Sequence, residues 1–255
     1  MFKTPQTDRL MIGGIVEDMA ALGLGSLAFL GLDDAYGEGG LTELQGLLEG
    51  TGIELTTVER YGRTDTNVTA QVLRAVSGNP DAVLVWGVVA DTELVVRALR
   101  ERGYEGQIYV SHGVGNPTFL QQVGAAGEGV RLPIGPLLVV NDLAEDNPVR
   151  QAALEFQQAY DGVYGAGTAS TFGGHAFDAV TGLRLAIEAA AANGADFMDL
   201  AASRAAIRDA LEALEPFTGV GGVFDWTSED HLGLDERALV IAEIRDGTWR
   251  LAGAE

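Results

Sequence analysis

Residues 23–40 read GLGSLAFLGLDDAYGEGG, and this stretch decides the fold class. Its centre, Ser26–Leu32, is a short apolar run without the alternation of polar and apolar side chains that marks a surface strand. Such a run is typical of a strand that is buried on both faces in a parallel sheet. Gly23 and Gly25 come before the run and end a helix, so the stretch predicts a helix followed by a parallel strand.

The same alternation extends outward from this stretch as far as residue 138. Repeated helix and strand units usually form a parallel sheet that is covered by helices, so we expect an α/β fold. Pro133 and Pro136 lie in the last expected strand and favour an edge position or a crossover between lobes. The helices are expected at residues 10–22, 41–49, 68–77 and 92–102, and the strands at 26–32, 53–59, 82–86, 107–110 and 129–138.

The pattern changes after Asp142. Residues 148–160, 176–192 and 200–214 predict three helices with no strand between them. Because helices bury their apolar faces against another layer, we expect these three to pack beside the first-half sheet and to add no strand to it. The remaining chain predicts short strands at 222–225, 239–244 and 249–251, with an Asp246-Gly247 hairpin turn between the last two.

The composition excludes several classes of chemistry. The chain has 255 residues, 47% of them hydrophobic, which is enough to bury a sizeable core. It has no cysteine, so disulfides, thiolate metal sites and cysteine nucleophiles are excluded. The net charge of −21 disfavours a nucleic-acid partner. Lys3 is the only lysine, which removes most Schiff-base and lysine-base chemistry.

No targeting or membrane segment is expected within the chain. The most apolar early stretch, residues 11–32, contains Glu17, Asp18 and several glycines. It also lacks the basic segment that precedes the apolar core of a signal peptide. No run reaches the roughly 18 uncharged apolar residues that a membrane helix needs.

Seven short motifs occur along the chain in a fixed order, and together they carry a resemblance to a known family. They are Phe2-Lys3-Thr4, Tyr36-Gly37-Glu38-Gly39, Asn79-Pro80-Asp81, His112-Gly113-Val114, Glu128-Gly129-Val130, Ala176-Phe177-Asp178-Ala179 and Gly221-Gly222-Val223-Phe224. No single motif is specific, but the ordered set resembles the type I periplasmic binding proteins, in particular the branched-chain amino-acid and amide family that serves ABC importers. The resemblance covers essentially the whole chain.

The resemblance implies two Rossmann-like α/β lobes joined by hinge crossovers. Residues 1–136 then match the second, C-terminal lobe, residues 137–231 a helical return to the first lobe, and residues 232–255 a final return to the second. The first part of the N-terminal lobe looks absent. Without that part, the apolar faces of the helices within 148–214 should be exposed, and the chain should associate with itself or need a partner segment.

The function that the resemblance implies is that of an extracytoplasmic receptor, periplasmic or on the cell surface. It would bind a small amino-acid-like, amide or aromatic or keto-acid solute in a cleft between the lobes and present it to the membrane subunits of an ABC importer. Such a receptor catalyses nothing and needs no cofactor or metal. Two rival hypotheses are a cytoplasmic ligand-sensing regulator on the same scaffold and an α/β enzyme. Against an enzyme, the chain has no Gly-x-Ser-x-Gly elbow and no dinucleotide loop after the first strand.

Five residues are candidates for ligand contact. Tyr36 lies just after a strand, where open α/β sheets bind ligands, but from the residues alone an ordinary turn is the favoured interpretation. The resemblance favours ligand contact for Tyr36. It also places Phe172 over the apolar part of the ligand, with a core aromatic as the alternative. Asp91 is predicted to cap the helix at 92–102, with ligand contact as its second interpretation.

Two of the candidates depart from the leucine-binding members of the family. Val88 stands where those members have a tyrosine, which widens the pocket. His112 stands where they have the glutamate that neutralises the ligand ammonium, and an imidazole cannot replace that charge. An α-amino acid is therefore disfavoured as the ligand. His175 and His231 are interpreted as a packed or capping residue and a residue of a solvated loop, not as metal ligands.

Overall fold

The computed structural model describes residues 1–253, which form two compact units. The helical unit consists of Met1–Thr7 and Gly135–Ala238, and the sheet unit consists of Asp8–Ile134 and the chain from Leu239 onward. These bounds differ from the expected ones at residues 1–7, 135–136 and 232–238. The first seven residues belong to the helical unit because they are bonded to it, for example from Thr4 Oγ1 to the His175 carbonyl at 3.0 Å. The assignment of the units to lobes of a receptor stays a prediction.

The sheet unit is built on seven strands in the order β2-β1-β3-β4-β5-β8-β9. The first five pair in parallel, and β8 and β9 are antiparallel additions. The predicted strands at 26–32, 82–86 and 107–110 are confirmed to the residue. The bounds are β1 (Ser26–Leu32), β2 (Glu54–Tyr61), β3 (Ala82–Trp86), β4 (Gln107–Val110), β5 (Arg131–Ile134), β8 (Val240–Arg245) and β9 (Thr248–Leu251).

The strand predicted at 129–138 is shorter than expected. β5 ends at Ile134, and Pro136 begins a 3-10 segment. β5 pairs with β4 only through Tyr109 and Arg131. Pro133 lies beyond this pair, so its lack of an N–H costs no hydrogen bond to β4. The chain leaves the sheet unit directly after Ile134.

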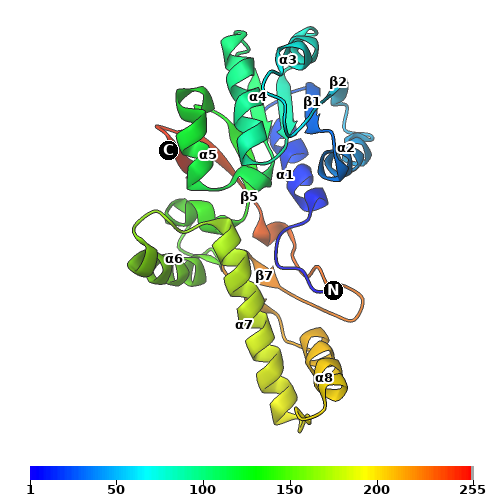
Figure 1. Ribbon diagram of the computed structural model, residues 1–255, viewed down its shortest axis with the longest axis vertical. Coiled ribbons are helices and arrows are strands. Elements are labelled where there is room, and N and C mark those ends of the chain that lie inside the picture. Colours follow the sequence, from blue (N-terminus) through cyan, green and yellow to red (C-terminus); the bar gives the residue numbers. More distant parts are fainter. Residues whose placement is uncertain (254–255) are drawn as a thin grey trace. The chain divides into compact units, whose positions relative to one another are not determined.

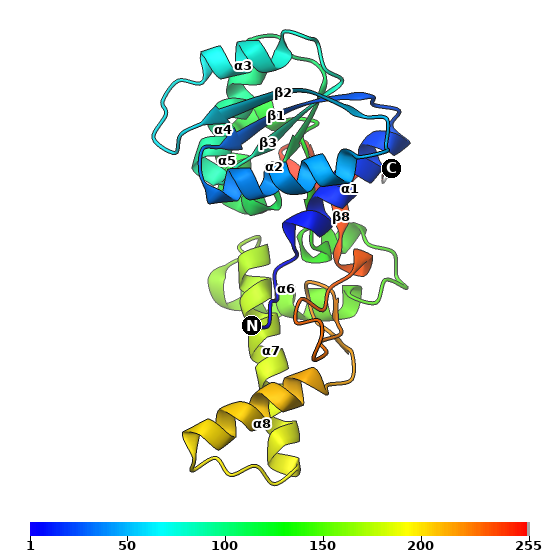
Figure 2. The ribbon, with the colours of Figure 1, turned by 90° about the vertical axis from the view of Figure 1, so that its right-hand side faces the viewer.

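Helices cover both faces of this sheet. Figure 2 shows α1 (Asp8–Ala21) and α2 (Ala35–Leu48) on one face and α3 (Thr69–Val76) on the other, where α4 (Val89–Glu101) also lies. The apolar sides of α1 and α2 pack on β1 and β3, where Ile15, Phe29 and Trp86 are at most 1% exposed. A fifth helix, α5 (Pro117–Val123), was not predicted; it is only seven residues long and is capped by Asn116.

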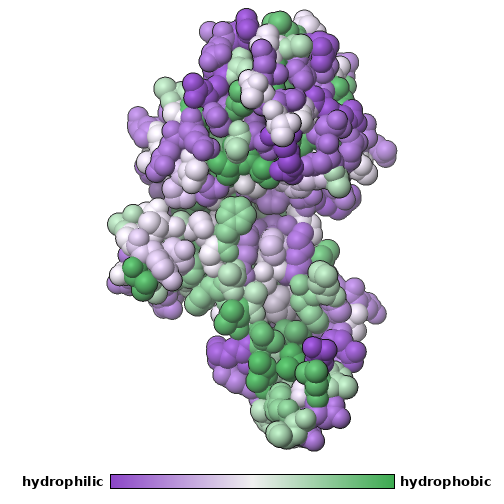
Figure 3. All heavy atoms as spheres, viewed as in Figure 1, coloured by the Kyte–Doolittle hydropathy of each residue, from purple (hydrophilic) through white to green (hydrophobic). Residues whose placement is uncertain are grey.

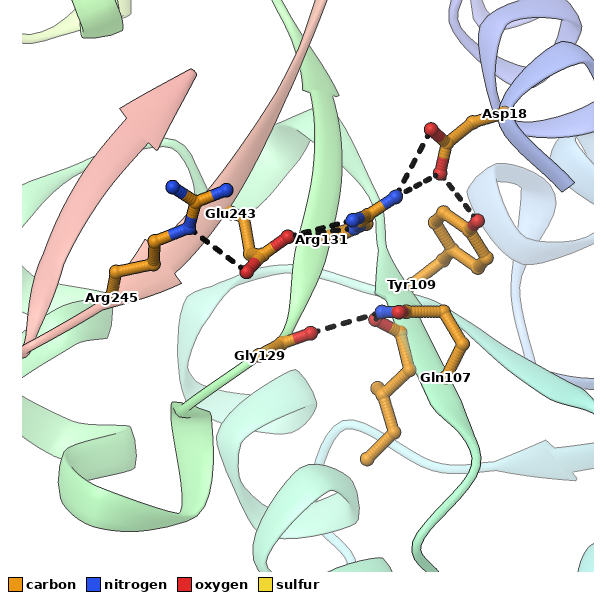
Figure 4. Close-up of polar contacts among 8 residues, drawn as sticks. Asp18, Gln107, Tyr109, Gly129, Arg131, Glu243 and Arg245 are labelled. Carbon is orange, nitrogen blue, oxygen red and sulfur yellow. Dashed lines mark hydrogen bonds and ion pairs between the residues drawn. The ribbon is translucent and has the colours of Figure 1, made fainter. Parts of the chain in front are cut away.

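An ion network ties the last helical turns of α1 to the middle of the sheet. Arg131 of β5 pairs with Asp18 at 3.0 Å and with Glu243 of β8 at 2.8 Å, and each of these three side chains is about 15% exposed. The Tyr109 hydroxyl donates to Asp18 as well, as Figure 4 shows. The network joins α1, β4, β5 and β8 into one body.

The helical unit contains α6 (Arg150–Tyr164), α7 (Thr171–Ala192) and α8 (Leu200–Glu212), with a two-stranded sheet of β6 (Phe217–Thr218) and β7 (Val223–Phe224). As predicted, the seven-stranded sheet takes no strand from residues 140–220, all of which are described. Figure 1 shows the elements along the chain. Within the described residues, four 3-10 turns complete the fold: η1 (His112–Val114), η2 (Gly124–Gly127), η3 (Pro136–Asp142) and η4 (Glu236–Ala238). Within residues 1–253, no helix has both the length and the apolar character that crossing a membrane requires.

Candidate ligand-binding site

The candidate site lies at the carboxyl ends of the parallel strands of the sheet unit. The strand order reverses between β1 and β3, because β1 continues to β2 on one side and the chain then returns to β3 on the other. Open α/β sheets bind ligands at such a switch point. Tyr36 follows β1, Val88 follows β3 and His112 follows β4. The sheet order therefore brings together residues that are far apart in the sequence.

Three aromatic rings form the centre of this edge. The Tyr36 ring stacks on the Trp86 indole with 5.7 Å between centroids and 28° between planes. The His112 ring meets the same indole edge-on, also at 5.7 Å. Trp86 is fully buried as the last residue of β3, so it is a floor beneath the two more accessible rings.

The first turn of α2 positions Tyr36. Asp34 caps this helix, and its carboxylate accepts from the backbone N–H groups of Tyr36 at 2.9 Å and Gly37 at 3.1 Å. The bond from Gly37, followed by the Arg63 guanidinium, holds the pKa of Asp34 below its usual value. Gly40 lets α2 approach the sheet, because a Cβ there would lie 2.3 Å from the Trp86 indole nitrogen.

The Tyr36 hydroxyl is a neutral hydrogen-bonding group in this setting. Burial raises the pKa of Tyr36 far above its usual value. The hydroxyl lies 3.4 Å from the position that a Cβ on Gly113 would take, and Ser111 Oγ and the Gly87 carbonyl lie beside the same position. Ser111 Oγ donates a hydrogen bond to the Gly87 carbonyl at 2.5 Å. The turn after β4 thus brings Tyr36 close to His112.

His112 lies at the start of η1 with its side chain 16% exposed. Its Nε2 is 3.6 Å from Asp8 Oδ1, at the first residue of α1. This pair places an imidazole nitrogen and a carboxylate together at the edge of the sheet. Among residues 1–253, no group of three or more histidine, aspartate or glutamate side chains is arranged to hold a metal ion.

Val88 and Asp91 stand at the start of α4. Val88 is the N-cap of this helix, in extended conformation and without a side-chain cap bond. The prediction that Asp91 caps the helix is wrong, because α4 begins at Val89 and Asp91 already lies inside its first turn. The Asp91 carboxylate instead lies 3.7 Å from Arg63, is 10% exposed, and has its pKa raised by burial.

Phe172 is the one candidate outside the sheet unit. It is the second residue of α7 in the helical unit, and 55% of its surface is exposed. It is not part of the core of that unit, so the alternative of a core aromatic is wrong. Ligand contact through Phe172 stays a prediction.

Sequence reasoning overlooked Trp86, Asp34 and Arg63. Trp86 was assigned only to a strand, although an aromatic residue at the carboxyl end of a central parallel strand is a usable signal. Asp34 precedes Tyr36 by two residues, the spacing of a helix cap. Arg63 follows β2, and its contacts with Asp34 at 2.6 Å and with Asp91 depend on the fold alone.

The other two histidines lie in the helical unit. His175 is in the second turn of α7, and burial, with a further effect from Lys3, lowers its pKa to about 4. The packed interpretation of His175 fits this burial. His231 Nε2 lies 3.1 Å from Glu212, and the His231 ring stacks on Phe2 at 4.1 Å, so its side chain is packed against neighbours in its loop.

Comparison with known proteins identifies the family. The family model of the periplasmic binding proteins matches residues 1–248. The chain belongs to this family. No curated protein matches the chain. The fold is that of a type I periplasmic binding protein, which it shares with an extracellular ligand-binding receptor and a leucine-binding protein of known structure.

Three solved structures illustrate the relation of this periplasmic binding protein to others. Rp1789 from Rhodopseudomonas palustris CGA009 is 31% identical, with a TM-score of 0.91, over 97% of this chain and 69% of that chain. An extracellular ligand-binding receptor from Rhodopseudomonas palustris HaA2 is 35% identical, with a TM-score of 0.90, over 98% of this chain and 69% of that one. The leucine-binding protein LivK from Thermotoga maritima MSB8 is 21% identical, with a TM-score of 0.78, over 99% and 67%. The last shows the fold alone.

The family and these relatives are binding proteins and receptors, not enzymes. The chain is therefore a solute-binding protein. A periplasmic family with extracellular relatives implies a location outside the cytoplasm.

Proposed function

We propose that this chain is the solute-recognition part of an ABC importer receptor in the periplasm or on the cell surface. We further propose that the solute it binds is an aromatic acid or a keto acid. The observation that carries the proposal is the meeting of Tyr36, Trp86 and His112 at the switch point of the sheet. Two of these groups offer hydrogen bonds, and the third is an apolar floor. This combination suits a flat apolar solute with one polar or anionic end.

The polar groups at the edge of the sheet support an acid over an amine. His112 stands beside Asp8 and offers an imidazole nitrogen next to the aromatic rings. Asp34 and Asp91 face Arg63, which neutralises them in part. An ammonium group bound beside His112 would have to share the Asp8 carboxylate with the imidazole, and an incompletely paired buried charge costs several kcal/mol. A carboxylate there forms a charge-assisted hydrogen bond instead.

Val88 supports a ring-shaped solute. Its short side chain opens α4 at the carboxyl end of β3, and it is only partly buried. In the leucine-binding members of the family a tyrosine occupies this position. Replacing an aromatic wall by valine leaves room beside Tyr36 for a ring that stacks on it.

Calorimetry on the full-length native receptor tests the proposal with benzoate, phenylpyruvate and leucine as probes. We expect binding of an aromatic or keto acid, and a loss of roughly tenfold to a hundredfold in affinity in His112→Ala, the size of a lost charged hydrogen bond. His231→Ala is the matched control, because His231 lies in the helical unit outside the candidate site. Micromolar or tighter binding of leucine, unchanged in His112→Ala, contradicts the proposal.

A further inference from the structure

The chain passes between its two units three times, after Thr7, after Ile134 and after Ala238. In the sheet unit each crossing meets a regular element almost at once. Helix α1 begins at Asp8, β5 ends at Ile134, and β8 begins at Val240. The freedom of the three crossings therefore depends on how firmly the chain is held in the helical unit.

One side chain in the helical unit lies next to the first crossing and contacts the chain at the other two. Gln6 precedes the first crossing by one residue and is 2% exposed. Its Nε2 donates to the carbonyl of Ala238, the last residue before the third crossing, at 3.1 Å, and to the Gly221 carbonyl at 3.0 Å. Gly135, the first residue after the second crossing, lies against the same amide, because a Cβ there would be 2.7 Å from Nε2.

One acceptor of this amide, Gly221, is itself anchored on α7. The backbone N–H groups of Val220 and Gly221 donate to the buried Asp178 carboxylate at 2.8 and 2.9 Å. Two residues before Gln6, Thr4 Oγ1 donates to the His175 carbonyl of the same helix. Gln6 therefore joins the crossings to the longest helix of the unit and not to a loose loop.

We propose that Gln6 is a positioning residue for the hinge, a single amide that makes the three crossings bend together at the bonds that follow Thr7, Ile134 and Ala238. Hinge motions are absorbed by a few residues at the ends of elements. With Gln6 in place, the helical-unit ends of the crossings cannot shift independently, since a shift of the first or third crossing breaks hydrogen bonds of a buried amide and Gly135 at the second packs against the same amide. The inference goes beyond the proposed function and needs no solute for its test.

The absence of cysteine makes a distance measurement between the units direct. Spin labels at Gln45→Cys on α2 and Gln158→Cys on α6, both exposed positions, report the distance between the sheet unit and the helical unit. Gln6→Met keeps the length of the side chain and removes its donors. We expect the population outside the wild-type distance range to rise on the order of tenfold, the effect of losing two hydrogen bonds.

The chain offers a matched control. Gln107 Nε2 also bridges two carbonyls, those of Ile108 at 2.9 Å and Gly129 at 3.0 Å, but entirely within the sheet unit (Figure 4). Gln107→Met should leave the distance distribution between the units unchanged. A label pair within the helical unit, Gln158→Cys with Ala205→Cys, should stay narrow in every variant that keeps this unit folded.

Gly135→Ala tests the role of the Gln6 amide without a substitution at Gln6 itself. The added methyl group displaces the Gln6 amide and should broaden the distribution in the same way. If Gln6→Met broadens the distances of the label pair within the helical unit, Gly135→Ala becomes the variant that tests the proposal. The proposal is overturned if both variants keep the wild-type distribution, or if Gln107→Met broadens it equally.

Discussion

Asp178 is a carboxylate that the fold removes from water completely. It has no exposed surface, and it accepts hydrogen bonds from the backbone N–H groups of Val220 and Gly221. Those bonds favour the charged form, but the loss of hydration is larger and raises the pKa of Asp178 to about 6. The neighbouring His175 is neutral near pH 7, because its own pKa is lowered to about 4. It therefore provides no counter-charge for Asp178.

The raised pKa predicts that Asp178 stabilises the fold more at acidic than at neutral pH. Its contribution is fully present below the unfolded value of 3.8 and is lost as the pH rises through about 6. This rise of the pKa from 3.8 to about 6 corresponds to about 3 kcal/mol. Urea unfolding at pH 4 and pH 7 should therefore show a smaller difference between the two pH values in Asp178→Asn than in the wild type. Asp209→Asn on the exposed face of α8 is the control, and equal pH profiles for wild type and Asp178→Asn would contradict the prediction.

At the scale of the element, α2 shows how one helix positions the candidate site. Its first turn carries Tyr36, and its second turn must approach the sheet closely enough for Tyr36 to stack on Trp86. That approach depends on Gly40, which packs on the indole of the fully buried Trp86. Gly39, the preceding residue of the same helix, has nothing within 4 Å of its Cβ position.

We expect Gly40→Ala to destabilise the protein by about 1–3 kcal/mol, the range for overpacking a core, and to weaken solute binding by moving Tyr36. Gly39→Ala should be neutral or stabilising by up to about 1 kcal/mol, because alanine favours a helix over glycine. Denaturant unfolding of both variants measures the difference. If Gly39→Ala and Gly40→Ala behave alike, Gly40 does not set the approach of α2.

At the scale of the whole molecule, α7 has an unusual distribution of side chains. The residues that it buries are small or polar: Thr171, Gly174, Asp178, Gly182, Ala186 and Ala190. Its large apolar side chains are exposed instead, among them Phe177, Val180, Leu183 and Ile187. Figure 3 shows apolar residues gathered over α7 on this face. The predicted exposure of apolar helix faces is confirmed for this helix.

An apolar stripe of this kind predicts self-association of the 255-residue chain on its own. Sedimentation equilibrium should show dimers or larger species, and Leu183→Gln combined with Ile187→Gln should shift them toward monomer. Leu73→Gln is the control, since Leu73 is 49% exposed on α3 in the sheet unit. A wild-type chain that stays monomeric at all concentrations would show that the α7 stripe alone does not drive association.

The local pattern of the sequence determined the class of fold and most of its elements. The apolar runs at β1, β3 and β4 specify buried strands without reference to any partner, and glycines and prolines mark where helices end. The position of Tyr36 after β1 was likewise readable, because a strand end followed by a helix start is a local feature. The start of α4 was not readable, since the helix begins at Val89 and its N-cap, Val88, has no side chain that could form a cap bond.

Only the tertiary structure decided which distant residues meet. The meeting of Tyr36, Trp86 and His112 depends on the strand order, and strand order arises from pairings between segments that carry no mutual signal in the sequence. The role of Gln6 was invisible for the same reason, because its partners lie more than 200 residues away. The sequence also predicted α7 as a helix but not which side faces inward. Helical periodicity sets the spacing of side chains along a helix, whereas the neighbouring layers decide which face is buried.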